Sequence, residues 1–143
     1  YKGYKTLDLN DGELISSLSV PKTEDKFKLY KVSIRKDLDI SAVTFAAKYK
    51  IENGKIEKFS LALGGVGATV LRISEIEKEL TGAEWKRENF FKAAAMLDTL
   101  ITPMSDVRGT KEYRMRVSKN LLVKFYDEVS REIEQGVTSE VTL

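Results

Sequence analysis

Alternating apolar and polar positions in the first half of the chain predict β-strands. Apolar side chains recur at every second position in three runs, residues 27–35, 41–51 and 55–63. This period is that of a strand with one buried face. Asn53-Gly54 separates the last two runs, and this dipeptide favours a two-residue hairpin turn. A shorter apolar run, Leu14–Val20, ends at Pro21 and predicts one more short strand.

The spacing of apolar residues changes from two to three or four after the glycines at 64–67, which predicts helices. A first helix is expected to begin at Ser74, since Ser74 and Glu77 have the spacing of a capping box, and to stop at Gly82. A second helix carries the apolar stripe Phe90, Ala94, Leu97 and Ile101. Pro103 then ends it.

The clearest helical pattern lies in the last third of the chain. Its apolar positions are Val117, Leu121, Leu122, Phe125, Val129 and Ile133. Gly136 ends this helix, and residues 137–143 are expected to be frayed. Because strands come first and helices follow, we predict an α+β fold, with a three- or four-stranded antiparallel sheet packed against a three-helix layer.

Two absences from the composition limit the chemistry that the chain can perform. The 143 residues, enough for one domain, include no histidine and no cysteine. This excludes disulfides, cysteine zinc sites, cysteine-held iron–sulfur clusters and the Ser-His or Cys-His pairs of nucleophilic catalysis. Any chemistry here must use carboxylates, lysines, tyrosines, backbone groups or a cofactor shared with another segment.

The charge balance predicts neither a nucleic acid nor a membrane as a partner. There are 24 basic and 22 acidic residues, so the net charge is only +2 and the surface has no strong field of one sign. No apolar run approaches the ~18 residues of a membrane span, and no signal-peptide pattern opens the chain. A cytoplasmic location is therefore expected.

The stretch at residues 64–67 has an unusual composition for a loop. Gly65-Val66-Gly67 matches part of a dinucleotide-binding fingerprint, but the strand before it is predicted to pair in a hairpin, whereas that fingerprint needs a parallel βαβ unit. Three glycines in four residues still allow positive φ or a close approach of the backbone to another group. The stretch is therefore either a functional loop or a tight exit from the sheet.

The other polar and aromatic clusters favour ordinary structural roles. Asp37 and Asp39 offer too few oxygen ligands for a calcium loop, and we expect a solvated turn in which Asp39 bonds to nearby amides. An exposed, ion-paired helix face is expected for Lys111, Arg114, Arg116, Lys119 and Lys124. Core positions are expected for Phe90, Phe91, Phe125 and Tyr126.

Four stretches in collinear order resemble one family, the C-terminal part of the FAD-binding subunit or segment of molybdenum hydroxylases. They are Tyr4–Ile15, Lys31–Val43, Leu61–Thr69 with Arg72, and Pro103–Gly109 with Tyr113-Arg114. Each motif alone is weak, whereas the four in order cover nearly the whole chain. The family includes xanthine dehydrogenase and the CO dehydrogenase flavoprotein, and the resemblance of the second stretch is closest to the xanthine dehydrogenase branch.

The resemblance implies that residues 1–22 close a preceding FAD-binding subdomain, and that residues 23–143 form a domain covering the isoalloxazine end of FAD. The chain would then be a C-terminal fragment that alone neither holds FAD firmly nor catalyses a reaction. Asp106 and Arg108 are expected to form an internal ion pair. The flavin-facing residues that the resemblance implies are Gly64, Gly65, Val66, Lys31, Asp39 and Ile40.

The resemblance also implies partners. Substrate would be hydroxylated at a molybdenum cofactor, and electrons would pass through iron–sulfur clusters to FAD and then to NAD or another acceptor. The molybdenum cofactor and the clusters would be held by other segments or subunits. Two alternatives stay open: a stand-alone domain whose sheet edge or glycine loop binds a protein, and a regulatory domain that binds a small molecule.

Overall fold

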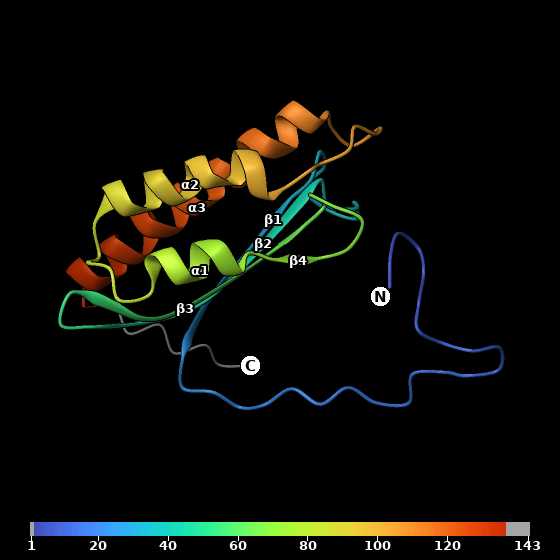
Figure 1. The fold of residues 1–143 in the computed structure, drawn as a ribbon, viewed down its shortest axis with the longest axis horizontal. Coiled ribbons are helices and arrows are strands. Elements are labelled where there is room, and N and C mark those ends of the chain that lie inside the picture. The colour runs from blue at the N-terminus through green and yellow to red at the C-terminus, as the bar shows by residue number, and fades with distance from the viewer. Residues whose placement is uncertain (1, 137–143) are drawn as a thin grey trace.

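The computed structural model describes residues 2–136 as one β-sheet with helices covering one of its faces (Figure 1). The elements are β1 (Lys26–Val32), β2 (Val43–Glu52), β3 (Lys55–Gly64), β4 (Leu71–Arg72), α1 (Ser74–Leu80), α2 (Arg87–Leu100) and α3 (Lys111–Glu134). All strand pairs are antiparallel, in the order β1-β2-β3-β4. The predicted α+β fold is confirmed, with four strands and three helices in the described part of the chain.

The hairpin of β2 and β3 forms as the sequence predicts. Phe45 lies opposite Leu63, and both side chains are buried under the helices. Asn53 and Gly54 both have positive φ, 50° and 72°, as the favoured two-residue hairpin turn requires. Because side chains alternate between the faces, the next residue along each strand points away from the helices.

The fourth strand is not the one that the apolar run Leu14–Val20 predicts. That run forms no strand, and Leu18 and Val20 are 86% and 87% exposed. It lies away from the sheet, where no described strand pairs with its backbone, and an isolated strand is not stable in water (Figure 1). The fourth strand is instead β4, which pairs with the end of β3 after the glycine loop.

Phe125 on α3 lies at the centre of the hydrophobic core. Its ring contacts aromatic rings of the sheet, of the loop before α2 and of α2, with centroid distances of 5.1 to 5.9 Å. The five partner rings belong to Phe45, Tyr49, Phe59, Trp85 and Phe90. Tilted and edge-to-face pairs at these distances stabilise a core beyond the burial of their area. One side chain therefore joins the sheet to the helical layer.

The predicted helical stripes are confirmed except at the end of α3, where Ile133 is 52% exposed, and one of the expected core aromatic residues also differs. Phe90 and Phe125 are fully buried and Tyr126 is partly buried, but Phe91 is 50% exposed, so its expected core position is wrong. One residue along a helix is a rotation of roughly 100°, which turns Phe91 away from the stripe. It packs instead against the guanidinium of Arg87, 4.9 Å from its ring centroid. The expected fraying of 137–143 lies outside the described residues.

The capping box predicted for α1 does not form. The Ser74 hydroxyl bonds to Glu75, and the helix start has no side-chain cap. Glu77 turns inward and accepts hydrogen bonds from the Leu61 amide and from Arg72, both at 2.9 Å. Because β4 has only two residues, it leaves the Leu61 amide unpaired, and the buried carboxylate takes the place of a strand carbonyl.

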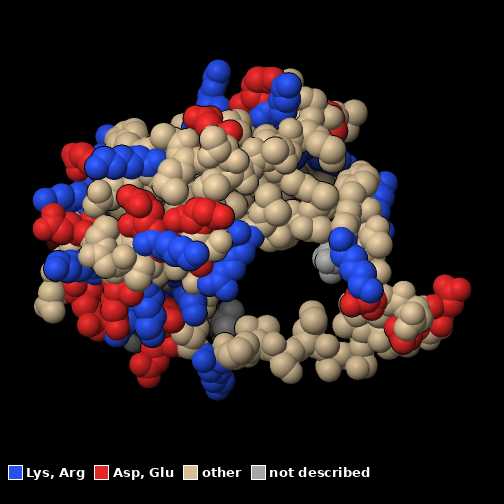
Figure 2. All heavy atoms as spheres, viewed as in Figure 1, with Lys and Arg blue, Asp and Glu red and all other residues tan. Residues whose placement is uncertain are grey.

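The basic residues near the start and middle of α3 are mostly ion-paired at the surface, as expected. Lys119 pairs with Asp98 at 2.6 Å, and Lys124 pairs with Glu128. Figure 2 shows basic and acidic side chains intermixed over the helical side. Within residues 2–136, no helix has the length and apolar character needed to cross a membrane.

The position of Phe125 generates a first prediction. Phe125→Ala should lower the free energy of unfolding by about 3–5 kcal/mol, because it opens a cavity among five rings. Ile133→Ala on the same helix is the control, because that side chain is already 52% exposed and its truncation should cost about 1 kcal/mol or less. Urea unfolding of both variants measures the difference, and equal costs would contradict the central role of Phe125.

Glu77 generates a second prediction. Burial raises the pKa of this carboxyl, but the bonds from Arg72 and the Leu61 amide outweigh that effect and hold its pKa below the usual value of about 4.5. A lowered folded-state pKa contributes stability above the unfolded-state value and loses it as the pH falls through the folded-state value. Glu77→Gln should therefore destabilise the domain at neutral pH and flatten the decrease of stability below pH ~4.5. Unfolding midpoints measured across that range test this, and an unchanged acid limb would contradict it.

Candidate cofactor-facing site

One end of the sheet gathers the stretches that the sequence singles out. Because neighbouring strands of this sheet are antiparallel, the end of β1, the start of β2 and the end of β3 lie at the same end of the sheet. A cavity of about 510 Å³ lies there, and all four motif stretches line it. Its lining includes Tyr4 of the first stretch, Ser41 of the second, Gly65 of the third and Asp106 of the fourth. The fold therefore brings together motifs that lie up to about a hundred residues apart in sequence.

A second hollow, of about 300 Å³, lies on the face of the sheet that the helices leave open. Lys31 pairs in register with Thr44, and Thr44 with Gly64, so these three residues form a row across the sheet. Leu29, Ala46 and Ala62 form the next row. The floor of this hollow is consequently made of small residues on β2 and β3, with the Lys31 and Leu29 side chains of β1 at its edge.

Gly64 is required for the shape of this floor. A Cβ atom at residue 64 would overlap the Thr44 hydroxyl and approach a Val70 methyl group to 3.7 Å. Without a side chain at 64, Thr44 can stand beside the strand and the surface stays level. Such a level, weakly polar surface suits the face of a planar ring system.

Lys31 is exposed, and its ammonium forms no ion pair with another described residue. Two other lysines of the same face share an acidic partner, since Asp25 lies 3.3 Å from Lys48 and 3.8 Å from Lys58. Lys31 is therefore available to donate hydrogen bonds to a group lying on the floor.

The loop that follows β1 is organised by Asp39. Its carboxylate accepts hydrogen bonds from the backbone amides of Arg35 and Ile40, each at 2.9 Å. The Arg35 amide is the largest influence that holds the pKa of Asp39 below its usual value, so the group is ionised at neutral pH. The expected bonding of Asp39 to nearby amides is confirmed. Ile40 beside it is 64% exposed at the surface of this end of the molecule.

The glycine loop itself makes a close approach that only glycine permits. Gly65 has φ +78°, and a Cβ there would overlap the Ala42 carbonyl and lie 2.9 Å from a guanidinium nitrogen of Arg114. The adjacent Val66 is fully buried in the core, so its side chain anchors the loop from beneath. Gly64 faces the open hollow, whereas Gly65 lines the cavity on the other side of the loop.

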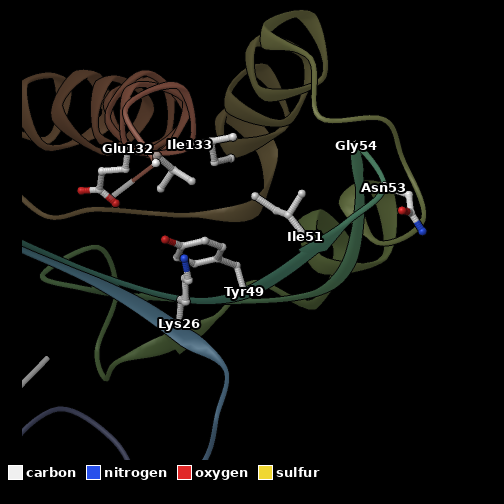
Figure 3. Close-up of a pocket in the computed structure, with 9 residues that line it drawn as sticks. Lys26, Tyr49, Ile51, Asn53, Gly54, Glu132 and Ile133 are labelled. Atoms are coloured by element: carbon white, nitrogen blue, oxygen red, sulfur yellow. The ribbon is translucent and has the colours of Figure 1, made fainter. Parts of the chain in front are cut away.

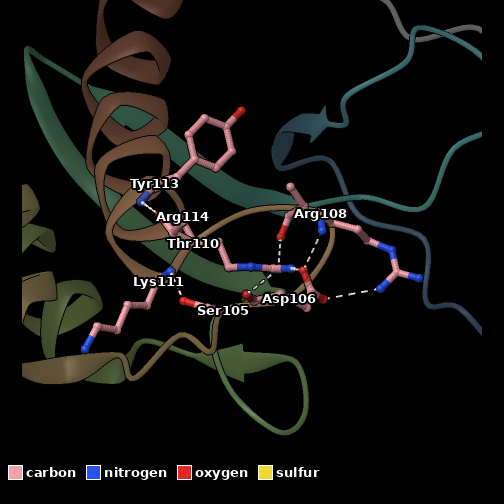
Figure 4. Close-up of polar contacts among 9 residues, drawn as sticks. Ser105, Asp106, Arg108, Thr110, Lys111, Tyr113 and Arg114 are labelled. Atoms are coloured by element: carbon pink, nitrogen blue, oxygen red, sulfur yellow. Dashed lines mark hydrogen bonds and ion pairs between the residues drawn. The ribbon is translucent and has the colours of Figure 1, made fainter.

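Arg114 is the main residue of this site that the sequence analysis misplaced. It was expected on an exposed face, yet it is only 5% exposed. Figure 4 shows its polar contacts. Its guanidinium donates to the carbonyl oxygens of Ala42 and Gly65 and to Asp106, at 2.9 Å for Gly65 and 2.6 Å for Asp106. The spacing of the sequence did indicate burial of Arg114, because positions 114, 118, 121 and 125 have helical spacing and share the buried side of α3.

Asp106 joins this network to the loop before α3. The predicted pair with Arg108 is confirmed at 3.3 Å, and the shorter contact with Arg114 adds to it. The Arg108 amide, and after it the Arg114 guanidinium, hold the pKa of Asp106 below its usual value. Asp106 is therefore an anion at neutral pH, as the buried cation requires.

A third cavity, of about 370 Å³, lies at the opposite end of the sheet, between the hairpin turn and the end of α3 (Figure 3). Ile51 and Ile133 line it, together with Tyr49, Lys26 and Glu132. Burial, and after it the Glu132 charge, raises the pKa of Tyr49 to about 12, so its hydroxyl stays protonated. None of the residues expected to face a cofactor lies here.

Comparison with known proteins decides the family. Residues 28–129 match the CO dehydrogenase flavoprotein C-terminal domain. The chain belongs to this family. It is 33% identical to the glyceraldehyde dehydrogenase medium chain of Sulfolobus acidocaldarius over 130 residues, which are 91% of this chain and 46% of that relative. It is 29% identical to the carbon monoxide dehydrogenase medium chain of Afipia carboxidovorans, over 85% of this chain and 43% of the relative.

Solved structures of related enzymes share the fold of this CO dehydrogenase flavoprotein C-terminal domain. The reconstituted CO dehydrogenase from Oligotropha carboxidovorans aligns with a TM-score of 0.75 and 27% identity, over 87% of this chain and 44% of that chain. Quinoline 2-oxidoreductase from Pseudomonas putida 86 aligns with a TM-score of 0.81 over 91% of this chain and 45% of that chain; at 22% identity this likeness concerns the fold. The chain spans less than half the length of each of these relatives.

The described residues fit the ring end of a flavin better than its phosphates. Lys31 and the level floor provide a hydrogen-bond donor beside an apolar surface. The glycine loop leads into β4 and not into a helix, so it lacks the helix N-terminus that holds a pyrophosphate in dinucleotide sites. No group of three or more His, Cys, Asp or Glu residues within 2–136 is arranged to hold a metal ion.

The close approach at Gly65 generates a third prediction. Gly65→Ala should destabilise the domain by at least about 2 kcal/mol more than Gly82→Ala does, because both glycines have positive φ but only Gly65 also lacks space. At Gly82 nothing lies within 4 Å of the added Cβ, so that variant measures the backbone strain alone. Thermal unfolding of both variants provides the comparison, and equal losses would show that the contact with Arg114 and Ala42 is not tight.

Proposed function

We propose that this chain is the flavin-covering portion of the flavoprotein of a molybdenum hydroxylase resembling xanthine dehydrogenase. The observation that supports this most is the meeting of four sequence motifs around the glycine loop, in a chain of the CO dehydrogenase flavoprotein C-terminal domain family. A preceding segment would hold the phosphates of FAD, and the present domain would cover the ring. The domain then positions the cofactor and controls the access of an electron acceptor, and it is not catalytic alone.

The open face of the sheet is the surface that we assign to the flavin. When bound, FAD supplies the redox chemistry, and the protein supplies position and electrostatics. Gly64 keeps the floor level, and Lys31 donates hydrogen bonds to acceptor atoms at the edge of the ring. The ionised Asp39 fixes the loop that continues from β1, and Ile40 excludes water at the rim. Gly65 and Val66 hold the neighbouring turn in place.

The partners follow from the same proposal. In the complete enzyme, electrons released at molybdenum would pass through iron–sulfur clusters to FAD and then to NAD as acceptor. The molybdenum-binding subunit, the iron–sulfur domain and the preceding FAD-binding subdomain would be the neighbours of this domain, and residues 1–22 would complete that subdomain. The exposed apolar residues of the 2–22 segment support this. Leu14 and Leu18 are 77% and 86% exposed, and exposed apolar side chains of this kind are typical of a surface that another segment covers.

An interaction domain without redox chemistry is the second candidate. Large apolar side chains are exposed on the loops around the glycine loop, with Leu38 at 98% and Val107 at 89%. Exposed apolar groups gathered at one end of a domain mark a contact surface. A protein that takes up no flavin would favour this candidate.

Substitution of Lys31 tests the assignment. In the complete protein, Lys31→Met should weaken FAD binding about tenfold or more, because a charged hydrogen bond to the cofactor is lost. Lys58→Met is the matched control, since Lys58 lies on the same face of the sheet but towards the hairpin. Titration of the apoprotein with FAD, followed by flavin fluorescence, gives both dissociation constants. Equal constants for the two variants would contradict the assignment of the flavin to this face.

A further inference from the structure

Arg114 is the one buried cation among the described residues, and it joins three segments that are distant in sequence. Only Glu77, Arg114 and Ser118 are buried among the polar residues of 2–136. A buried charge is costly unless hydrogen bonds and an opposite charge compensate it. Retaining a cation at this position therefore needs a reason beyond the packing of α3.

The hydrogen bonds of the guanidinium show which segments it joins. One terminal nitrogen donates to two carbonyl oxygens, those of Ala42 just before β2 and of Gly65 just after β3. The other terminal nitrogen donates to Asp106, in the loop before α3 (Figure 4). Thr110 accepts a hydrogen bond from the Tyr113 amide at 3.1 Å and so caps the helix turn that carries Arg114.

These two carbonyls lie just beyond the last row of the floor, at the same end of β2 and β3. Gly65 follows Gly64 directly, and Ala42 lies two residues before Thr44. Thr44 and Gly64 are register partners, so the guanidinium joins the two strands just beyond this pair of the floor. It does so from the helical side of the sheet, whereas Lys31 stands on the open side beside Thr44.

Glycine and arginine at this contact depend on each other. The space that a side chain at residue 65 would fill is occupied by the Arg114 guanidinium and the Ala42 carbonyl. Asp106 fixes the orientation of the guanidinium, through a contact 2.6 Å long. A lysine could not replace this arrangement, since an ammonium on a flexible stem lacks the planar fork that reaches two carbonyls and a carboxylate at once.

We infer that Arg114, oriented by Asp106, is the positioning residue of the flavin-facing floor: it sets the backbone at Ala42 and Gly65 and thereby the placement of Thr44, Gly64 and Lys31. This inference rests on the proposed function. Arg114 itself does not touch the open face, so it acts on the cofactor only through the backbone that it holds.

The experiment compares Arg114→Lys with Arg116→Lys in the complete flavoprotein. Arg116 lies two residues further along α3 and is exposed. Its substitution also replaces a guanidinium by an ammonium, but at a position that makes none of the Arg114 contacts. For Arg114→Lys we expect a shifted visible absorption band of the bound flavin, a changed flavin reduction potential and an FAD dissociation constant raised at least about fivefold. Arg116→Lys should match the unmodified protein in all three. A folded Arg114→Lys protein with unchanged spectrum, potential and affinity would overturn the inference.

Asp106→Asn provides a second variant, in which the Arg114 side chain itself is unchanged. Asp106 is 40% exposed at its side chain, and its loss leaves the two carbonyl contacts of Arg114 in place. We expect the flavin band to shift in the same direction as in Arg114→Lys, but by less. The double variant should shift no further than Arg114→Lys alone, because both substitutions act on one contact. Additive shifts would overturn the inference. A complete, unmodified protein that takes up no FAD would instead contradict the proposed function.

Discussion

The structure of the candidate site depends on the burial of one guanidinium group. Arg114 is compensated by one carboxylate and two carbonyl oxygens, which come from the loop before α3 and from the ends of two strands. Breaking such a group by removing one partner typically costs about 3–5 kcal/mol, since it leaves a charge buried and unpaired. The loops at this end of the sheet are therefore fixed together, although each alone has the composition of a mobile connection.

The one-sided sheet explains how the domain divides its tasks between its faces. Aromatic and aliphatic side chains on the helical side form the core around Phe125. The open side carries small residues near the glycine loop and lysines paired with Asp25 towards the hairpin. Under the proposed function, this surface provides position and a hydrogen bond from Lys31 to the cofactor.

Local patterns predicted most of the fold, because those patterns report which side of each element is buried. The alternation in β2, the Asn53-Gly54 turn and the stripe through Leu121 and Phe125 are confirmed for this reason. Predictions that depend on a distant partner were less reliable. The run at 14–20 is apolar enough for a short strand but has no described strand to pair with. Glu77 has the spacing of a capping residue but satisfies the amide of Leu61 in β3.

The residues of the site also divide into those that local chemistry predicts and those that depend on a distant partner. Asp39 and the pair of Asp106 with Arg108 follow from local chemistry, since each bonds within its own loop. Arg114 was misplaced because charge suggested exposure, while its position on the buried stripe indicated the opposite. That Lys31 and Gly64 lie in one row needs the strand register, which the sequence does not state.

The most direct test is an ultraviolet–visible absorption spectrum of the protein expressed from its complete native reading frame and purified with any subunits that accompany it. The account predicts a flavin band, with or without iron–sulfur absorption beside it. A colourless protein that takes up no added FAD would contradict the account, and the exposed apolar loops around the glycine loop would then indicate a protein-binding domain.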